Sequence, residues 1–144
     1  MKRFIKKSGF RTLEDECTAI ARGEVQLAGR ADLVKPVEIA RKRLSADALL
    51  NDLDKEKPII ILEHEPGDYE NLAKNGADLS LSGHTHNGQV FPGTIVTRLL
   101  NDMVYGFEER AGMQVIVTSG VGAYGPPLRI GTDSEIVIAD ITFK

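Results

Sequence analysis

The side chains best suited to chemistry are three histidines that lie close together in a chain of 144 residues. They are His64, His84 and His86, and the chain has no other histidine. Neutral imidazole is a common nitrogen ligand for divalent transition metals. The spacing alone leaves two interpretations open, a metal site or unrelated polar residues. A structural Cys/His zinc site is disfavoured, because Cys17 is the sole cysteine.

Each histidine follows a predicted strand. The apolar run 59–62 ends just before His64, and the run 78–82 ends just before the other two. The stretch between the runs predicts a helix, and this strand–helix–strand order favours two parallel strands. Residues at the carboxyl ends of parallel strands gather at one edge of a sheet. On an extended backbone, His84 and His86 would also point to the same side.

The rest of the chain continues this alternation, which predicts the α/β class. The pattern of residues 16–29 indicates a hairpin with its turn at residues 22–24. Ser45 is the predicted N-cap of a helix. Further helices are predicted at residues 36–44, 66–76 and 94–103, further strands at residues 105–107, 113–119 and 135–143, and a short helix or an irregular end at residues 1–7.

A hydrolytic two-metal centre also needs carboxylates, usually with one that bridges both ions. Glu63 and Glu65 flank His64, so on an extended backbone both point away from it. Asp78 begins a predicted strand, far from that strand's carboxyl end, and Asp68 lies within a predicted helix. None of these residues is therefore expected to bridge two metals.

The composition excludes several classes of protein. The net charge is −3, from 18 basic and 21 acidic residues, and gives no electrostatic argument for a nucleic-acid partner. A single cysteine excludes a disulfide framework. No apolar run approaches the ~20 residues of a membrane span, and residues 1–7 are not followed by the apolar stretch of a secretory signal. We expect no membrane span in this chain and a localisation that is cytoplasmic or undetermined.

Two further residues have both a functional and a structural interpretation. Arg129 follows a loop rich in glycine and proline at residues 120–127. It could bind a substrate phosphate with two parallel hydrogen bonds, or the loop could be only a rigid connection. Asp32 follows Gly29-Arg30-Ala31 and could face a site or belong to a turn.

Two segments carry a resemblance to a known family. Residues 59–66 read I-I-I-L-E-H-E-P, and residues 76–89 read G-A-D-L-S-L-S-G-H-T-H-N-G-Q. The tail, residues 117–138, contains S-G-V-G and P-P-L-R-I-G. In order and spacing, these segments resemble the C-terminal motifs of bacterial calcineurin-like metallophosphoesterases, L-x-H-x-P and D-L-x-L-S-G-H-T-H-x-G-Q. The resemblance extends from about Gly9 to the end, and Asn87 stands where this branch often has glycine.

The resemblance implies a four-layer α/β/β/α sandwich with mixed sheets, of which this chain would be the C-terminal half. It implies hydrolysis of phosphate mono- or diesters by metal-activated water at two divalent ions (Mn, Zn, Fe or Mg). His64 and His84 match ligands of the second metal, and His86 matches a ligand of the first. The family motifs D-x-H, G-D-x-x-D and G-N-H-[DE] are absent, and Gly67-Asp68 lies inside a predicted helix.

The missing motifs would supply the bridging aspartate and the catalytic histidine. We therefore expect residues 1–144 to form a single partial domain that contains no catalytic residue and binds one metal or none. Its partners would be a phosphate-ester substrate and either a missing N-terminal half or further copies of the chain. The alternative is a non-catalytic, self-associating fragment that binds at most one divalent metal, and whether the chain is an enzyme by itself stays open.

Overall fold

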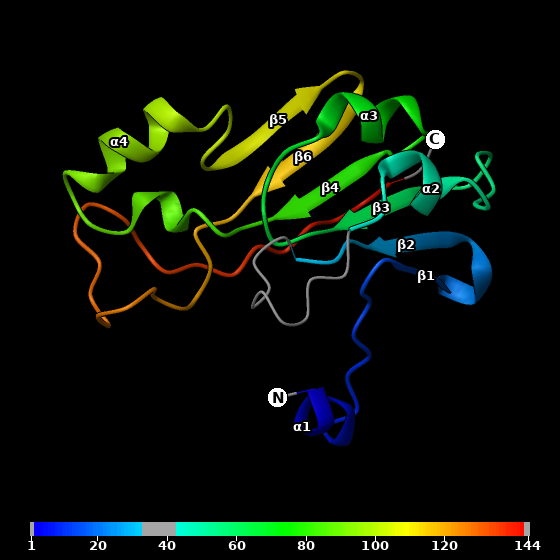
Figure 1. The fold of residues 1–144 in the computed structure, drawn as a ribbon, viewed down its shortest axis with the longest axis horizontal. Coiled ribbons are helices and arrows are strands. Elements are labelled where there is room, and N and C mark those ends of the chain that lie inside the picture. The colour runs from blue at the N-terminus through cyan, green and yellow to red at the C-terminus, as the bar shows by residue number, and fades with distance from the viewer. Residues whose placement is uncertain (1, 33–42, 143–144) are drawn as a thin grey trace.

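The protein folds around one six-stranded mixed sheet. The computed structural model describes residues 2–32 and 43–142. The strand order is β1-β2-β3-β4-β6-β5, with the four inner strands parallel and the two edge strands antiparallel to their neighbours (Figure 1). The strands are β1 (Glu16–Ile20), β2 (Val25–Gly29), β3 (Ile59–Leu62), β4 (Leu79–Ser82), β5 (Gly106–Arg110) and β6 (Met113–Val117).

The helices are short. They are α1 (Lys2–Lys7), α2 (Ala46–Leu50), α3 (Tyr69–Lys74) and α4 (Gly93–Leu100). Figure 1 shows α1 set apart from the sheet at the end of an extended segment, and α4 at the opposite end of the molecule from α2. No helix in the described ranges is long and apolar enough to cross a membrane.

The alternation of side chains along the strands produces two apolar faces. Ile59 and Ile61 pack with Leu50 of α2 and Leu72 of α3 in the larger core cluster. Ile60 faces the other way, where a smaller cluster also contains Val25 and Leu79, with Leu27, Leu62, Leu81 and Ile116 only partly buried around it. Helices α2 and α3 therefore cover one face of the sheet more completely than the opposite face is covered.

Most of the expected elements are present in the structure. The hairpin forms as β1 and β2, and the strands at 59–62 and 78–82 form as β3 and β4, which are parallel. Ser45 caps α2, because its side-chain oxygen accepts a hydrogen bond from the backbone N–H of Ala48 at 3.2 Å. The predicted helix at 36–44 lies almost entirely outside the described residues. The α/β class is confirmed.

Two expectations need correction. The helix predicted from Pro66 begins only at Tyr69, because Gly67 and Asp68 have φ values of 149° and 59°, outside the helical region. The strand predicted at 135–143 does not form within its described part, where Ile138 is 86% exposed. A strand is stable only when a neighbour completes its hydrogen bonds, and no neighbour pairs with this segment in the described chain. The described residues form one sheet, without a second sheet packed on it.

Candidate metal centre

Parallel pairing of β3 and β4 places His64 beside His84. Leu62 pairs with Leu81, and the backbone N–H of Gly83 donates to the carbonyl of His64 at 3.1 Å, which extends the contact past both strands. As a result, Nε2 of His64 and Nδ1 of His84 lie 3.0 Å apart. The two rings meet edge to face, with centroids 4.8 Å apart and an interplanar angle of 84°.

This arrangement fits one divalent ion bound by both rings. Imidazole nitrogens bind zinc at ~2.0–2.1 Å, so two of them on one ion are roughly 2.8–3.4 Å apart for angles between about 90° and 110°. The distance between the His64 and His84 nitrogens lies within this range. Both rings are exposed enough for an ion to reach them.

The backbone after β4 is a tight turn. His84, His86 and Asn87 have positive φ values of 67°, 49° and 51°. The expectation that an extended backbone points both histidines to the same side is therefore wrong. The cause is the end of the β4–β6 ladder near Ser82, beyond which hydrogen bonds such as Gly88 N–H to Thr85 O, at 2.7 Å, close the chain on itself.

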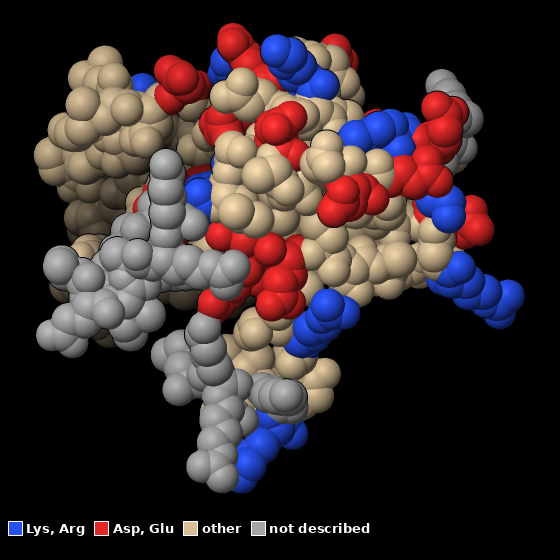
Figure 2. Space-filling model, turned by 45° about the vertical axis from the view of Figure 1, so that its right-hand side comes forward, with Lys and Arg blue, Asp and Glu red and all other residues tan. Residues whose placement is uncertain are grey.

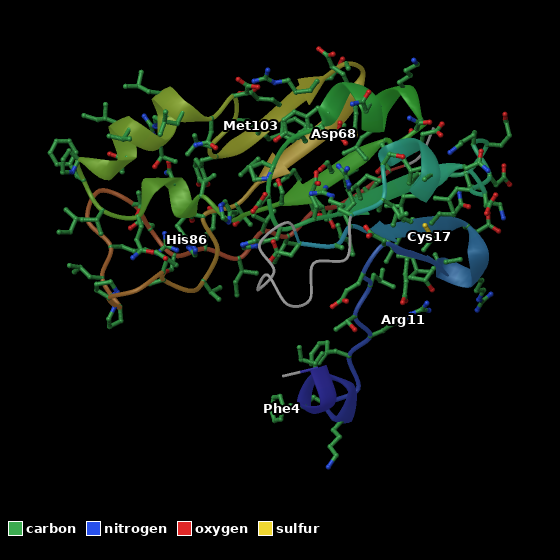
Figure 3. All side chains as sticks on the ribbon, viewed as in Figure 1. Phe4, Arg11, Cys17, Asp68, His86 and Met103 are labelled. Atoms are coloured by element: carbon green, nitrogen blue, oxygen red, sulfur yellow. The ribbon has the colours of Figure 1, made fainter. Side chains whose placement is uncertain are left out.

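Despite this turn, the three histidines line one cavity. A cavity of about 610 Å³ is lined by His64, His84 and His86 together with Asp32 and Tyr124. Figure 3 shows His86 among the residues near the loop drawn in orange, which follows β6. Partial burial and the nearby Arg129 guanidinium lower the pKa of His86, which favours the neutral ring that a metal requires.

The described residues do not complete a metal site. No group of three or more His, Cys, Asp or Glu side chains within 2–32 and 43–142 is arranged to hold one ion. His86 therefore shares the cavity with the close pair of His64 and His84 but not their coordination geometry. The chain brings two imidazole nitrogens close together and places a third imidazole on the same cavity.

Asp32 lies on the same cavity, which favours the site-facing interpretation over a simple turn. The sequence contained a signal for this position. Asp32 follows the carboxyl end of β2, as the histidines follow β3 and β4, and β2 is parallel to β3. The strand-end rule therefore applies to all three strands.

Glu63 is engaged away from the histidines, in a buried ionic network. Its carboxylate accepts hydrogen bonds from Arg30 at 3.3 Å, from Arg43, and from the Ser80 hydroxyl at 3.2 Å. The Glu63 side chain is only 1% exposed and that of Arg30 4%. Burial raises the pKa of Glu63 and the two guanidinium groups oppose that shift. Arg30 also pairs with Asp68 at 2.7 Å.

The other two carboxylates considered from sequence lie elsewhere. Asp78 accepts a hydrogen bond from the Ile59 N–H at 2.8 Å, at the amino ends of the strands and so opposite the histidines. Glu65 borders a smaller cavity of about 270 Å³ beside the Glu63 network. Cys17 is half-buried next to the larger core cluster. None of these side chains reaches the three histidines.

Arg129 contacts backbone carbonyls. One terminal nitrogen donates to the carbonyl of His86 at 3.1 Å. The other donates to the carbonyls of Ser119 at 2.7 Å, Gly120 at 3.1 Å and Gly122. The guanidinium thus ties the loop at residues 119–122 to the turn that carries His86.

Comparison with known proteins identifies the family. An uncharacterized metallophosphoesterase of Helicobacter pylori strain J99 is 35% identical over 92% of this chain, and one of Aquifex aeolicus is 37% identical over 98% of it. A zebrafish (Danio rerio) transmembrane protein with a metallophosphoesterase domain is 39% identical over 76% of the chain. The chain belongs among the metallophosphoesterases.

The match covers only part of each metallophosphoesterase relative. The chain spans 36% of the Helicobacter protein, 54% of the Aquifex protein and 26% of the zebrafish protein. It corresponds to a C-terminal portion of a metallophosphoesterase, and the family implies dependence on divalent metal ions. No family model matches the chain, and no solved structure gives a significant match.

Proposed function

We propose that this chain is part of a metal-dependent phosphoesterase centre in which His64 and His84 bind one divalent ion and His86 binds a second. The observation that carries the proposal is the 3.0 Å separation of the His64 and His84 nitrogens at the carboxyl ends of two parallel strands. The relatives named metallophosphoesterases support the same chemistry.

In this proposal, the residues of the chain hold the metal ions and orient the rings that bind them. The strand ends fix the His64 and His84 rings with their nitrogens converging, so that little rearrangement is needed to bind an ion. Asp32 and Tyr124 border the same cavity, in which a phosphate ester of moderate size would fit. Bound divalent ions would supply Lewis acidity and activate water towards a phosphorus atom. The proposed ions are Mn, Zn, Fe or Mg, since imidazole suits several of these metals.

The remaining ligands are proposed to come from polypeptide outside this chain. The described residues contain no complete three-ligand cluster, and Glu63 and Asp78 are occupied elsewhere. The second sheet of a four-layer sandwich would pack on the face that contains Ile60 and Leu79, where neighbouring leucines are only partly buried. An N-terminal half would supply both the ligands and this sheet.

The second candidate is a non-catalytic chain that self-associates. Exposed apolar side chains favour it, since Leu99 and Leu100 of α4 are 79% and 77% exposed. Figure 2 shows a largely uncharged lobe at the left of the molecule, where α4 lies in Figure 1. Sedimentation of the chain at rising concentration tests this candidate. A Leu99→Ser, Leu100→Ser double variant that stays monomeric where the wild type dimerises would support it, and a monomeric wild type would exclude it.

Hydrolysis of bis(4-nitrophenyl) phosphate with added Mn²⁺ tests the main proposal. We expect negligible turnover by the 144-residue chain. We expect Mn²⁺-dependent turnover by the chain joined to an N-terminal half that carries the missing motifs, and loss of that turnover in His84→Ala. A joined protein without Mn²⁺-dependent turnover would contradict the proposal. Turnover by the isolated chain would show that it needs no ligands from outside.

A further inference from the structure

The turn that carries His86 places several residues in a sparsely populated region of backbone conformation. His86, Asn87 and Gln89 are not glycine, yet their φ values are 49°, 51° and 48°. Few residues with side chains adopt this region, and although histidine and asparagine tolerate it better than most, three such residues within one turn indicate that its surroundings stabilise the conformation. The turn therefore depends on contacts from outside it.

Arg129 makes the most extensive of these contacts. One terminal nitrogen donates to the His86 carbonyl at 3.1 Å, and the other lies 3.4 Å from Nδ1 of the His86 ring. The second nitrogen also donates to the carbonyls of the 119–122 loop, with Ser119 at 2.7 Å. One planar group thus links the backbone and the ring of His86 to a separate loop.

These contacts leave Arg129 little capacity for a substrate. Guanidinium recognition of phosphate needs two adjacent donors aimed at the anion. Both terminal nitrogens of Arg129 already donate to carbonyls, and its Nε is buried. Of the two interpretations that the sequence left open, these contacts favour a structural role for Arg129 over a contact with the reacting phosphate.

We propose that Arg129 is a positioning residue that fixes His86 at the edge of the cavity by joining the His86 turn to the 119–122 loop. The proposal rests on the proposed function for the role of His86 as a metal ligand. It adds that the geometry of this ligand is set by a residue 43 positions later in the chain. Groups that orient a metal ligand typically change metal affinity by about 10–100-fold when they are replaced.

A second contact, between Gln89 and Tyr124, also joins the His86 turn to the segment after β6, so a variant at Arg129 can remain folded. The side-chain amide of Gln89 accepts from the Tyr124 N–H at 2.6 Å and donates to the Tyr124 carbonyl at 2.8 Å. Arg129→Lys is the informative substitution. A single ammonium can still satisfy carbonyls of the 119–122 loop, but it cannot also reach the His86 carbonyl with a second nitrogen. Arg98→Lys, at an exposed position of α4, is the matched control.

The first measurement needs no metal. Histidine ring and backbone NMR signals are compared among the wild type, Arg129→Lys and Arg98→Lys. We expect Arg129→Lys to shift the His86 ring and the amides of residues 86–89, while the His64 ring signals stay unchanged. Unchanged His86 signals would overturn the proposal, and so would equal shifts at His64, which would indicate a general structural effect.

The second measurement is Mn²⁺ affinity. In the chain joined to an N-terminal half that carries the missing motifs, where the second ion has further ligands, we expect Arg129→Lys to weaken Mn²⁺ binding at the His86 position about tenfold and to have no effect in a His86→Ala background. The proposal would be overturned if Arg129→Lys bound Mn²⁺ as tightly as the wild type. It would also be overturned if Arg129→Lys weakened Mn²⁺ binding equally in the His86→Ala background. If the joined wild-type protein binds no Mn²⁺, the proposed function fails, and the NMR comparison alone decides the positioning role of Arg129.

Discussion

Nε2 of His64 and Nδ1 of His84 lie 3.0 Å apart, although 20 positions separate the two residues in the chain. The register of the parallel strands β3 and β4, with Leu62 opposite Leu81, produces this proximity. A strand–helix–strand unit thus builds the core of the candidate metal centre, and the helix between the strands sits on the face opposite the Ile60 cluster.

The ionic network around Glu63 should be essential for stability. Replacement of Glu63 by Gln leaves the Arg43 charge without the Glu63 carboxylate and leaves the buried Arg30 charge with Asp68 as its remaining carboxylate partner in the described network. Breaking a buried ion pair from one side typically costs about 3–5 kcal/mol. We expect a loss of this size in the free energy of unfolding, measured with urea. The exposed Glu56→Gln control should change it by less than about 0.5 kcal/mol, and equal effects of both substitutions would contradict the account.

Tyr69→Phe should leave the protein equally stable or more stable. The Tyr69 hydroxyl is buried without a hydrogen-bond partner among the described residues, which is unfavourable in the folded state. Burial and then the Glu63 carboxylate raise the pKa of Tyr69 to about 12, above the value of ~10 in an unfolded chain. The neutral phenol therefore favours the folded state up to about pH 10, and this contribution is lost as the pH approaches 12.

Urea unfolding between neutral and alkaline pH measures this effect. Tyr69→Phe should lose less stability than the wild type as the pH rises through the folded pKa. Tyr124→Phe is the control, because Tyr124 is 81% exposed and should behave like the wild type. A Tyr69→Phe variant that is clearly less stable at neutral pH would show that its hydroxyl has a partner.

Gly88 should be intolerant of a side chain. Its φ is 78°, and a Cβ at this position would lie 2.4 Å from Cα of Thr94, at the start of α4. Gly112 has a similar φ of 85° but open space around it. Alanine at either position is destabilising because its side chain disfavours a positive φ. The difference in stability between the two variants therefore isolates the steric clash at Gly88.

We expect Gly88→Ala to lower the free energy of unfolding by about 1–3 kcal/mol more than Gly112→Ala does. Chemical denaturation of both variants gives the comparison. Equal losses would mean that the turn after β4 and the start of α4 can separate without cost, which would contradict the close packing seen between them.

The sequence was sufficient to predict the elements with strong local signals. The apolar runs at 59–62 and 78–82 and the Ser45 cap all correspond to observed structure. The position of the histidines at strand ends followed from these runs. Residues 135–142 have the same β-rich pattern but form no strand, because pairing depends on a neighbouring strand that a local pattern does not encode.

The contacts between distant segments were harder to predict. Arg30 and Arg43 meet Glu63 only because the fold brings together the ends of β2 and β3 and the segment before α2. The positive φ values at His84 and His86 were also missed, since neither residue type requires them. Asp32 was singled out from sequence with two interpretations, and its position after a strand end of the predicted hairpin could have favoured the site-facing one.

The most direct test of the candidate metal centre is a calorimetric titration of Mn²⁺ into the wild-type chain, His64→Ala and His84→Ala at neutral pH. The account predicts that the wild type binds Mn²⁺ and that either substitution weakens binding at least about tenfold, since each removes one of two converging ligands. His64→Ala and His84→Ala combined should be little worse than either alone, because the two nitrogens act on one ion. Wild-type affinity in both single variants, or no binding by the wild type, would contradict the assignment of His64 and His84 as a ligand pair.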